Sequence, residues 1–198
     1  MLIAHDLGTT GNKATLVDNE GVMLASRTIG YDADWGDDGK AEQNPDDWWD
    51  AVCRASRELI AETHVSPSEI EAVSFSGQMM GAVPLDAHDD PVRPAIIWAD
   101  TRSVKECNQL IDRFGMDEAY RVTGHRLNAT YSLSKLMWLR TNEPDSFSRM
   151  TRFCLAKDYV VLKLTGELAT DPSDASSTNA YNQACLLYTS DAADDSLR

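Results

Sequence analysis

A short segment near the N-terminus brings together a carboxylate, two glycines and two hydroxyls: Asp6-Leu7-Gly8-Thr9-Thr10-Gly11. Glycine lets the backbone bend and approach an anionic ligand closely, and hydroxyls and successive N–H groups can point at phosphate oxygens. Asp6, at the end of a strand, would face a bound metal ion or its waters. The spacing matches neither the dinucleotide fingerprint nor the P-loop. The segment therefore predicts a phosphate-binding loop of another design, with an ordinary turn as the structural alternative.

A second set of side chains suits a sugar. These residues follow two predicted strands and combine polar groups with apolar surfaces: Gln78, Met79, Met80, Trp98, Asp100 and Arg102. A sugar needs hydrogen-bond partners for its hydroxyls and an apolar surface for its C–H face. Ligands of α/β folds collect at such strand ends. The structural alternative is that the Met and Trp residues are core, and that Asp100 caps a helix and pairs with Arg102.

The elements that must position these residues follow an α/β order. Strands are expected at 2–4 and 13–17, and a turn at 19–21 leads into a third strand. Further strands are expected at 72–76 and 94–98, and the segments 153–155 and 158–164 complete the pattern. Helices are expected from Pro45, with Asn44 as its cap, at about 101–114 and around 133–140, with a short turn at 66–69. This order, without internal repeats, predicts one α/β domain over residues 1–184.

Helical spacing also predicts buried faces. In the two longer helices the apolar positions are Trp49, Val52, Cys53, Leu59 and Ile60, and Val104, Cys107, Ile111 and Phe114. We expect the first face to cover a sheet. Residues 32–43, which are rich in Asp and Gly, are expected to form a surface loop.

The last segment, residues 185–198, breaks this pattern. It has no clear periodicity and no closing element, and it resembles the translated adapter-like tails of metagenomic open reading frames. We hypothesise that the native sequence ends near Ala184 and that the remainder is not native. Identical tail codons on independent genomic clones would contradict this hypothesis.

The composition of the 198 residues, 42% apolar and 25% charged, is that of a globular protein. A formal net charge of −14 opposes a nucleic-acid or anionic membrane surface, so a phosphate ligand would need local backbone donors. The four cysteines (53, 107, 154 and 185) form no C-x-x-C pair, which argues against a zinc site or a dense disulfide framework. No apolar run reaches the roughly 18 residues of a membrane span, and a reducing cytoplasm is expected.

Six ordered blocks carry a resemblance over residues 1 to about 183. They are 6–10, Trp48-Trp49 after Asn44-Pro45, Ser76-Gly77-Gln78-Met79-Met80-Gly81, 93–102, Leu155-Ala156-Lys157-Asp158-Tyr159 and 170–176. Together they resemble the FGGY carbohydrate kinases, and most closely their xylulokinase branch. The resemblance implies a ribonuclease-H-like α/β lobe of the actin, chaperone and sugar-kinase superfamily, with a mixed sheet flanked by helices. Two such lobes enclose the substrates in this family, and this chain resembles the first.

The resemblance also implies ligands and roles. It predicts ATP-dependent phosphorylation of a sugar, above all a pentulose such as D-xylulose, with Mg²⁺ as the metal. Asp6 is expected to hold Mg²⁺ through water, Thr9 and Thr10 to lie near the γ-phosphate, and Gly8 to belong to the same nucleotide-binding loop. Lys13 could pair with phosphate, with a salt bridge on the second strand as its alternative. Met79 and Met80 occupy the sugar-contacting pair, and a homodimer is open for a full-length parent.

One departure from the family pattern concerns the sugar. Xylulokinases commonly have Met-His where this chain has Met79-Met80, so an imidazole hydrogen bond to a sugar hydroxyl is not available. His5 replaces the small residue usual before Asp6 and is expected to be a packed neutral histidine. Xylulose is therefore favoured without being fixed by these residues.

The catalytic base, the adenosine pocket and further phosphate loops come from the second lobe in this family. We therefore expect the 198-residue chain to be inactive as a kinase and a longer parent to be active. The rival from another class is a non-enzymatic protein of the same superfamily that uses nucleotide hydrolysis for conformational change. A third interpretation is that the chain as given is a sugar-binding lobe without catalysis.

Overall fold

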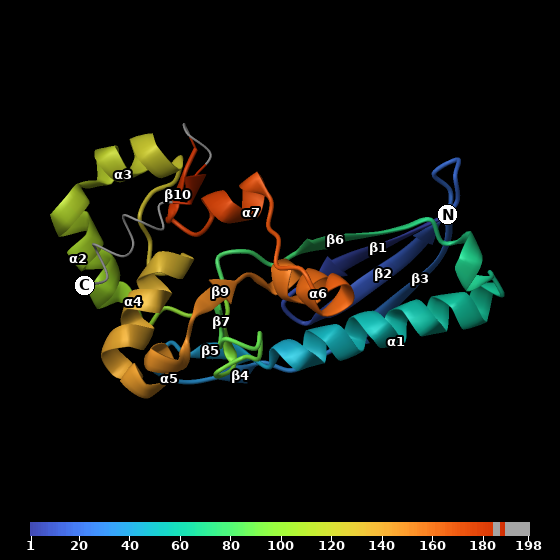
Figure 1. Cartoon of the computed structure of the whole chain (residues 1–198), viewed down its shortest axis with the longest axis horizontal. Coiled ribbons are helices and arrows are strands. Elements are labelled where there is room, and N and C mark those ends of the chain that lie inside the picture. The colour runs from blue at the N-terminus through green and yellow to red at the C-terminus, as the bar shows by residue number, and fades with distance from the viewer. Residues whose placement is uncertain (184–186, 189–198) are drawn as a thin grey trace.

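The computed structural model describes residues 1–183 and 187–188. The molecule is elongated, with a sheet and the N-terminus at one end and a group of helices at the other (Figure 1). Between these ends lie short strands and the helix labelled α6. The residues singled out by the sequence come from both ends and meet in this central region.

The main sheet has four strands in the order β3-β2-β1-β6. Their bounds are β1 Leu2–Leu7, β2 Gly11–Val17, β3 Met23–Gly30 and β6 Ala72–Gly77. Strand β1 pairs antiparallel with β2 and parallel with β6. The expected strands at 2–4, 13–17 and 72–76 and the strand after the turn are thus confirmed. The sheet is mixed, as the predicted ribonuclease-H-like fold requires.

Helix α1 (Pro45–Thr63) packs against β2 and β3. The side chain of Asn44 accepts a hydrogen bond from the N–H of Asp46 over 3.3 Å, so the predicted cap and Pro start are confirmed. The buried stripe is Trp48, Ala51, Val52, Ala55 and Leu59. Trp49 is only half-buried, because Trp48 fills the core position beside it.

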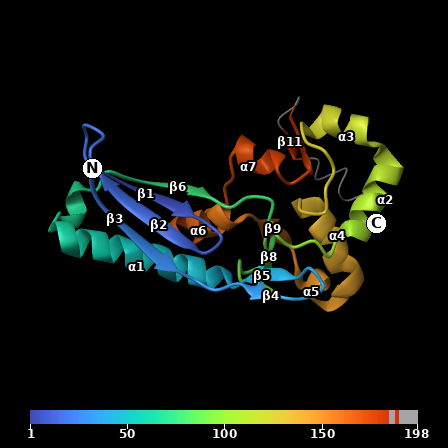
Figure 2. The same cartoon turned by 180° about the vertical axis from the view of Figure 1, so that it is seen from behind.

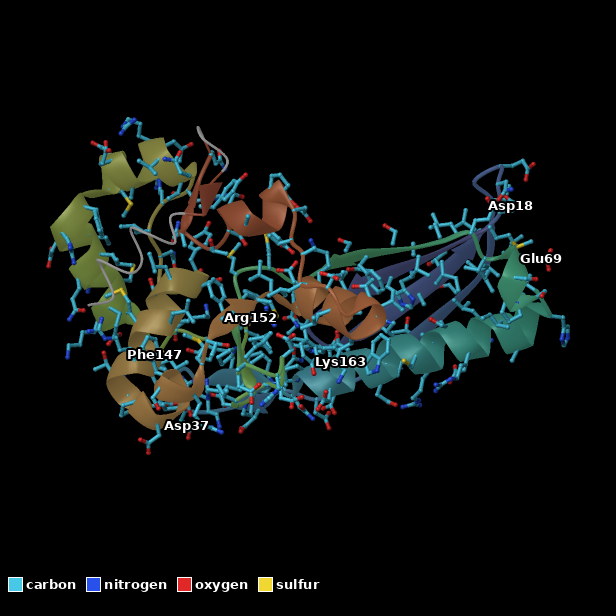
Figure 3. All side chains as sticks on the ribbon, viewed as in Figure 1. Asp18, Asp37, Glu69, Phe147, Arg152 and Lys163 are labelled. Carbon is cyan, nitrogen blue, oxygen red and sulfur yellow. The ribbon has the colours of Figure 1, made fainter. Side chains whose placement is uncertain are left out.

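Helix α6 (Ala156–Thr165) lies on the same side of the sheet as α1, and in the reverse view the strands lie in front of it (Figure 2). Its Tyr159 is fully buried and donates to the carboxylate of Asp46 in α1 over 2.7 Å. Lys163 lies over the start of α1 (Figure 3), 3.7 Å from that same carboxylate. These contacts join α6 to the N-terminal end of α1.

Short strands connect the sheet to the helical end. They are β4 (Asp34–Trp35), β5 (Ala41–Gln43) and β8 (Ala95–Ile96) in one small sheet, and β7 (Val83–Leu85) with β9 (Arg152–Cys154) in another. The helical end contains α2 Val104–Phe114, α3 Met116–Thr123, α4 Ser132–Asn142, α5 Pro144–Arg149 and α7 Pro172–Ser176. A 3-10 turn, η1 (Pro67–Glu69), precedes β6, and β10 (Tyr181–Asn182) pairs with β11 (Leu187–Tyr188).

Three sequence expectations need correction. Residues 32–43 are not a simple surface loop, because β5 lies within them and is buried. The strand expected at 94–98 is reduced to Ala95–Ile96. Helix α2 buries Glu106, Cys107 and Leu110 and leaves Val104 and Phe114 about half exposed, since its inner face lies against α4.

Most of the segment 185–198 lies outside the described residues, so the hypothesis about its origin stays a prediction. Cys53, Cys107 and Cys154 are free thiols. Within residues 1–183 and 187–188, no group of acidic, His or Cys side chains has the arrangement of a metal centre. A search of the same residues finds no helix able to cross a membrane.

Candidate functional site

The predicted phosphate loop is a tight turn between β1 and β2. The N–H of Gly8 donates to the carbonyl of Gly11 over 3.0 Å, which closes the turn. A Cβ atom at Gly11 would lie 2.7 Å from the carbonyl oxygen of Ile29, so only glycine fits this position. Tyr31 secures the loop from outside, with its hydroxyl 2.6 Å from the Gly8 carbonyl and its N–H 3.3 Å from the Thr10 carbonyl.

Asp6 lies at the end of β1, directly before the loop. Its cross-strand neighbours are Lys13 on β2 and Ser76 on β6, and all three side chains are exposed. Opposed residues of paired strands point to the same face of a sheet. Within residues 1–183 and 187–188, Lys13 forms no ion pair. The structure therefore groups Asp6 and Lys13 beside the loop and leaves both open to a ligand.

Thr9 is held by residues from distant parts of the chain. Its hydroxyl oxygen accepts a hydrogen bond from the indole Nε1–H of Trp98 over 2.8 Å, and its carbonyl accepts one from the amide of Gln43 over 2.7 Å. Trp98 was predicted to lie on the sugar side, and its side chain is 45% exposed. The structure thus brings the predicted sugar segment into direct contact with the predicted phosphate loop.

Gln78 follows β6 and lies beside the loop as well. Its N–H donates to the carbonyl of Leu7 over 2.8 Å, and its side-chain amide donates to Gln43 Oε1 over the same distance. Its own Oε1 is buried and has no hydrogen-bond partner among the described residues. Unpaired buried acceptors are rare in folded proteins and call for an explanation.

Met79 and Met80 are half-buried in the bend after Gln78. Met80 has a φ of 64°, a left-handed conformation that is unusual for a side chain of this size. The hydroxyl of Thr130 lies 3.9 Å from its sulfur, and Ser132 donates to the Gly81 carbonyl over 2.6 Å. The start of α4 is therefore docked against the predicted sugar-contacting pair.

Asp100 and Arg102 form an internal ion pair. Arg102 Nε donates to Asp100 over 2.9 Å, and its Nη2 lies 2.5 Å from Glu42. Asp100 is 1% exposed and also accepts from the N–H of Ala41. Burial opposes the charge of Arg102, but Asp100 and Glu42 more than offset it and raise its pKa. The ion pair is that of the structural alternative, but the other half of that alternative is wrong, because the residue that caps α2 is Ser103 and not Asp100. The two buried side chains thus lie beneath the candidate site.

Lys135 is buried next to this pair. It is 1% exposed and donates to the carbonyl of Thr130 in the segment before α4. Burial lowers its pKa to about 7, and the nearby Asp100 carboxylate opposes this change. The guanidinium of Arg102 covers the ring of Trp138 at 4.1 Å. Buried charges thus connect α4 to the segments that carry Trp98 and Gln43.

His5 is packed as the sequence indicated. It is 2% exposed, is stacked on Phe75 with ring centroids 5.2 Å apart, and lies within hydrogen-bond distance of Asn12 and Ser56. Burial lowers its pKa, which favours the neutral ring. His5 therefore stabilises the strand that presents Asp6.

Lys157 of α6 forms a second ion-pair cluster with carboxylates that lie before and within α7. It contacts Asp171, and its Nζ lies 3.0 Å from Asp174 and 3.7 Å from Asp158. Its hydrogen bond to Asp171 lowers the pKa of that carboxyl, whereas burial raises the pKa of Asp158 to about 6. Both effects belong to the packing of α6 against the segment 170–176.

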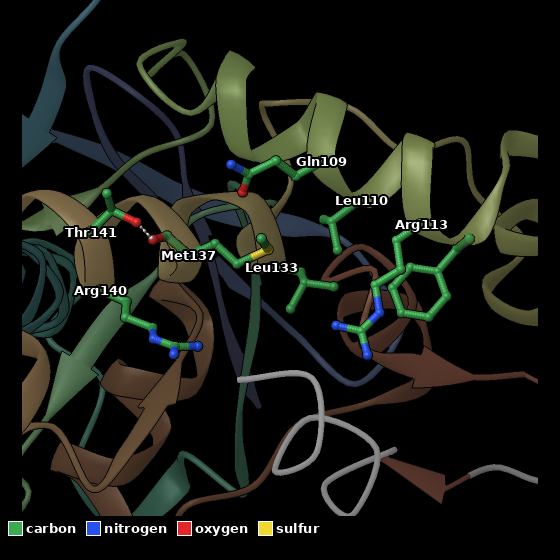
Figure 4. A pocket seen from close by; sticks show the side chains of 8 residues that line it. Gln109, Leu110, Arg113, Leu133, Met137, Arg140 and Thr141 are labelled. Atoms are coloured by element: carbon green, nitrogen blue, oxygen red, sulfur yellow. Dashed lines mark hydrogen bonds between the residues drawn. The ribbon is translucent and has the colours of Figure 1, made fainter. Parts of the chain in front are cut away.

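A separate hollow of about 350 Å³ lies between α2 and α4 (Figure 4). Leu110, Leu133 and Met137 form its apolar wall, and Arg113 and Arg140 stand at its rim. Its lining comes from these two helices, whereas the phosphate loop joins β1 and β2. The hollow is therefore distinct from the site described above.

Sequence reasoning missed three residues of the site: Tyr31, Gln43 and Thr130. Gln43 and Tyr31 lay in or before a segment interpreted as a loop, and neither has a motif of its own. The available signal for Gln43 was its position directly before the Asn44 cap, because residues that lead into a buried helix start are held in a defined place.

The fold defines a ribonuclease-H-like lobe with a tight turn at the predicted phosphate loop, and comparison with known proteins gives its family. A sequence profile described as the FGGY family of carbohydrate kinases, N-terminal domain, matches residues 1–194. The chain belongs to this family, as its motifs predicted.

Relatives and solved structures agree with this assignment. A xylulose kinase of Staphylococcus xylosus is 34% identical over 181 residues, which cover 91% of this chain and 37% of that protein. A xyloylose kinase from Brucella ovis superposes with a TM-score of 0.91 at 33% identity, over 98% of this chain and 40% of that one. A gluconate kinase from Lactobacillus acidophilus gives the same TM-score at 29% identity, over 98% of this chain and 39% of that one. The chain thus spans less than half the length of these relatives.

Proposed function

We propose that this chain is the first lobe of a kinase that transfers the γ-phosphoryl group of ATP to a sugar, most of all a pentulose such as D-xylulose. The observation that carries the proposal is the hydrogen bond between Trp98 and Thr9, because it unites a sugar-type surface with a phosphate loop. The named xylulose kinases among the relatives support the choice of sugar. The gluconate kinase of equal structural similarity shows that the lobe's fold is shared with kinases of other sugars.

The residues present fit Mg²⁺ and a nucleotide phosphate. Asp6 offers an exposed carboxylate at the strand end, and oxygen ligands are those that Mg²⁺ prefers. Gly8, Thr9 and Thr10 form the turn, and Lys13 adds a positive charge on the same face of the sheet as Asp6. Magnesium-bound ATP supplies the transferable phosphoryl group and the cation that offsets its charge. Asp6 would hold the metal through water.

On the sugar side, Trp98, Met79 and Met80 would contact the C–H face, and Gln78 would accept a hydrogen bond from a sugar hydroxyl. Asp100 and Arg102 would act beneath them through the ion pair described above. The proton of the attacking hydroxyl requires a base, and we assign this role to a second lobe. The 198-residue chain alone is then inactive, since loss of a base typically costs about a hundred- to ten-thousand-fold.

The test compares two proteins, the purified 198-residue chain and the product of a reading frame extended beyond codon 184. ADP release is measured with and without D-xylulose, and with gluconate as a second acceptor. Xylulose-dependent ADP release by the extended protein alone would support the proposal. Basal hydrolysis that ignores sugars would favour the nucleotide-switched rival, and phosphorylation by the short chain would contradict its predicted inactivity.

A further inference from the structure

Gln43 lies buried between the phosphate loop and the segment that follows β6. It is 3% exposed, and both the nitrogen and the oxygen of its side-chain amide form hydrogen bonds. Nε2 donates to the carbonyl of Thr9 over 2.7 Å and to that of Asp32 over 3.3 Å. Oε1 accepts from Trp48 over 3.2 Å and from Gln78 over 2.8 Å. A buried amide with partners on both ends is held in a single orientation.

These partners determine how both amides are turned. Backbone carbonyls only accept and an indole N–H only donates, so the Gln43 nitrogen must face Thr9 and its oxygen must face Trp48. Gln78 must then turn its nitrogen toward Gln43 Oε1. Its own oxygen is consequently the atom left buried without a partner among the described residues. A donor from a ligand would remove the free-energy cost of that unpaired oxygen.

We propose that Gln43 is a positioning residue that couples the sugar side of the site to the phosphate loop. This inference rests on the function proposed above, because it takes a sugar hydroxyl as the donor to Gln78 Oε1. A hydroxyl bound there restrains Gln78, Gln78 restrains Gln43, and Gln43 restrains the carbonyl of Thr9. Trp98 holds the Thr9 hydroxyl by a second route. Coupling between two ligands is reciprocal, so phosphate at the loop equally favours the sugar-binding orientation of Gln78.

The experiment follows backbone and side-chain amides of the complete 198-residue chain by ¹⁵N NMR. Gln78→Met removes the donor to Gln43, and Gln43→Met removes the connecting amide. We expect Gln78→Met to shift the Thr9 and Thr10 amide signals in the unchanged background. In the Gln43→Met background the same substitution should shift the Thr9 and Thr10 signals about fivefold less, because the effects of two coupled residues are not additive in a double-mutant cycle. Gln109→Met, the same chemical change on exposed α2, should leave these signals in place.

If Gln43→Met does not fold, Gln43→Glu replaces it. The carboxylate keeps the oxygen that accepts from Trp48 and Gln78 and loses the donor to Thr9, so the response of Thr9 must still vanish. A response of Thr9 that is absent in the unchanged background, or equal in both backgrounds, would overturn the inference.

A second arm adds D-xylulose. Shifts at the Gln78 side chain and at Thr9, with the Thr9 shift lost in the Gln43 variant, would support the coupling and the sugar together. Shifts at Gln78 that never reach Thr9 would overturn the coupling. A Thr9 response to Gln78→Met with no response to D-xylulose would support the coupling and count against the proposed sugar.

Discussion

Trp98 donates a hydrogen bond of 2.8 Å to the hydroxyl oxygen of Thr9, although 89 positions separate the two residues in the sequence. Because that oxygen accepts from the indole, the hydroxyl proton of Thr9 is free to point elsewhere, and a phosphate oxygen is a suitable acceptor. The contact also places an exposed aromatic ring beside the loop. In the proposed site, one side chain would thus shape the apolar wall and orient a donor of the predicted phosphate loop.

Trp98→Phe tests this contact. Phenylalanine keeps an apolar ring and loses the indole donor, so we expect the free energy of unfolding to fall by about 1 kcal/mol or less. In the extended kinase, kcat/KM for ATP should fall roughly tenfold through lost orientation of Thr9. Urea unfolding and steady-state kinetics give the two values. Trp35→Phe, at an exposed tryptophan of β4, is the matched control, and equal kinetic losses in both variants would contradict the assignment.

Arg102→Met tests the buried ion pairs. The substitution keeps much of the side-chain volume but leaves Asp100 and Glu42 without this cation. Breaking a buried pair from one side costs roughly 3 kcal/mol or more. Urea unfolding of the chain should show this loss, whereas Arg121→Met, which breaks an exposed pair with Glu118, should leave the midpoint nearly unchanged. Similar midpoints for both variants would show that the pair is not structural.

The sequence predicted the sheet well because its signals are local. The strand at 2–4, the turn at 19–21 and the Asn44-Pro45 helix start each depend on signals within a few residues, and the structure has all three as expected. The turn between β1 and β2 was predictable for the same reason, since its glycines are contiguous in the sequence, whereas its binding of phosphate stays a prediction. The short strands β4 and β5 were missed because β5 pairs with the distant β8, and β4 pairs in turn with β5.

The buried residues beneath the site were harder to predict, because their roles depend on partners that no local pattern shows. Asp100 and Arg102 were predicted to bind a sugar, with their mutual pairing as the alternative, but no local pattern showed that Glu42 is a further buried partner of Arg102. Gln43 has no motif, and its role follows from four hydrogen bonds to separate segments. Residues of this kind become visible only when tertiary contacts are known.

Lys135→Met tests the buried amine through pH. Below about pH 7 the amine is charged in both the folded and the unfolded chain. Between that value and the unfolded pKa of 10.5, the unfolded chain holds a proton that the folded chain has lost. Stability of the unsubstituted chain should therefore rise with pH by up to about 1.4 kcal/mol per unit relative to Lys135→Met. Urea unfolding between about pH 7 and pH 9 measures this difference. Parallel pH profiles would contradict a neutral buried lysine.

Met80→His tests the sugar preference. Histidine tolerates the left-handed conformation that Met80 adopts better than most large residues, so the unfolding free energy should change by no more than about 0.5 kcal/mol. An imidazole beside Thr130 would add a hydrogen-bond partner for a hydroxyl, and kcat/KM of the extended kinase for D-xylulose should rise roughly tenfold. Met116→His on α3 controls for the added ring. A fall in activity with D-xylulose would show that Met80 itself is the required residue.

The most direct test of the central claim is ADP release by the extended protein with D-xylulose, with Asp6→Asn measured in parallel. We predict xylulose-dependent release that drops by about a hundredfold or more in Asp6→Asn, as expected when charge stabilisation at the phosphates is lost. ATP hydrolysis that is indifferent to sugar, or full sugar-dependent activity in Asp6→Asn, would contradict the account of this lobe as the phosphate-binding and sugar-binding half of a carbohydrate kinase.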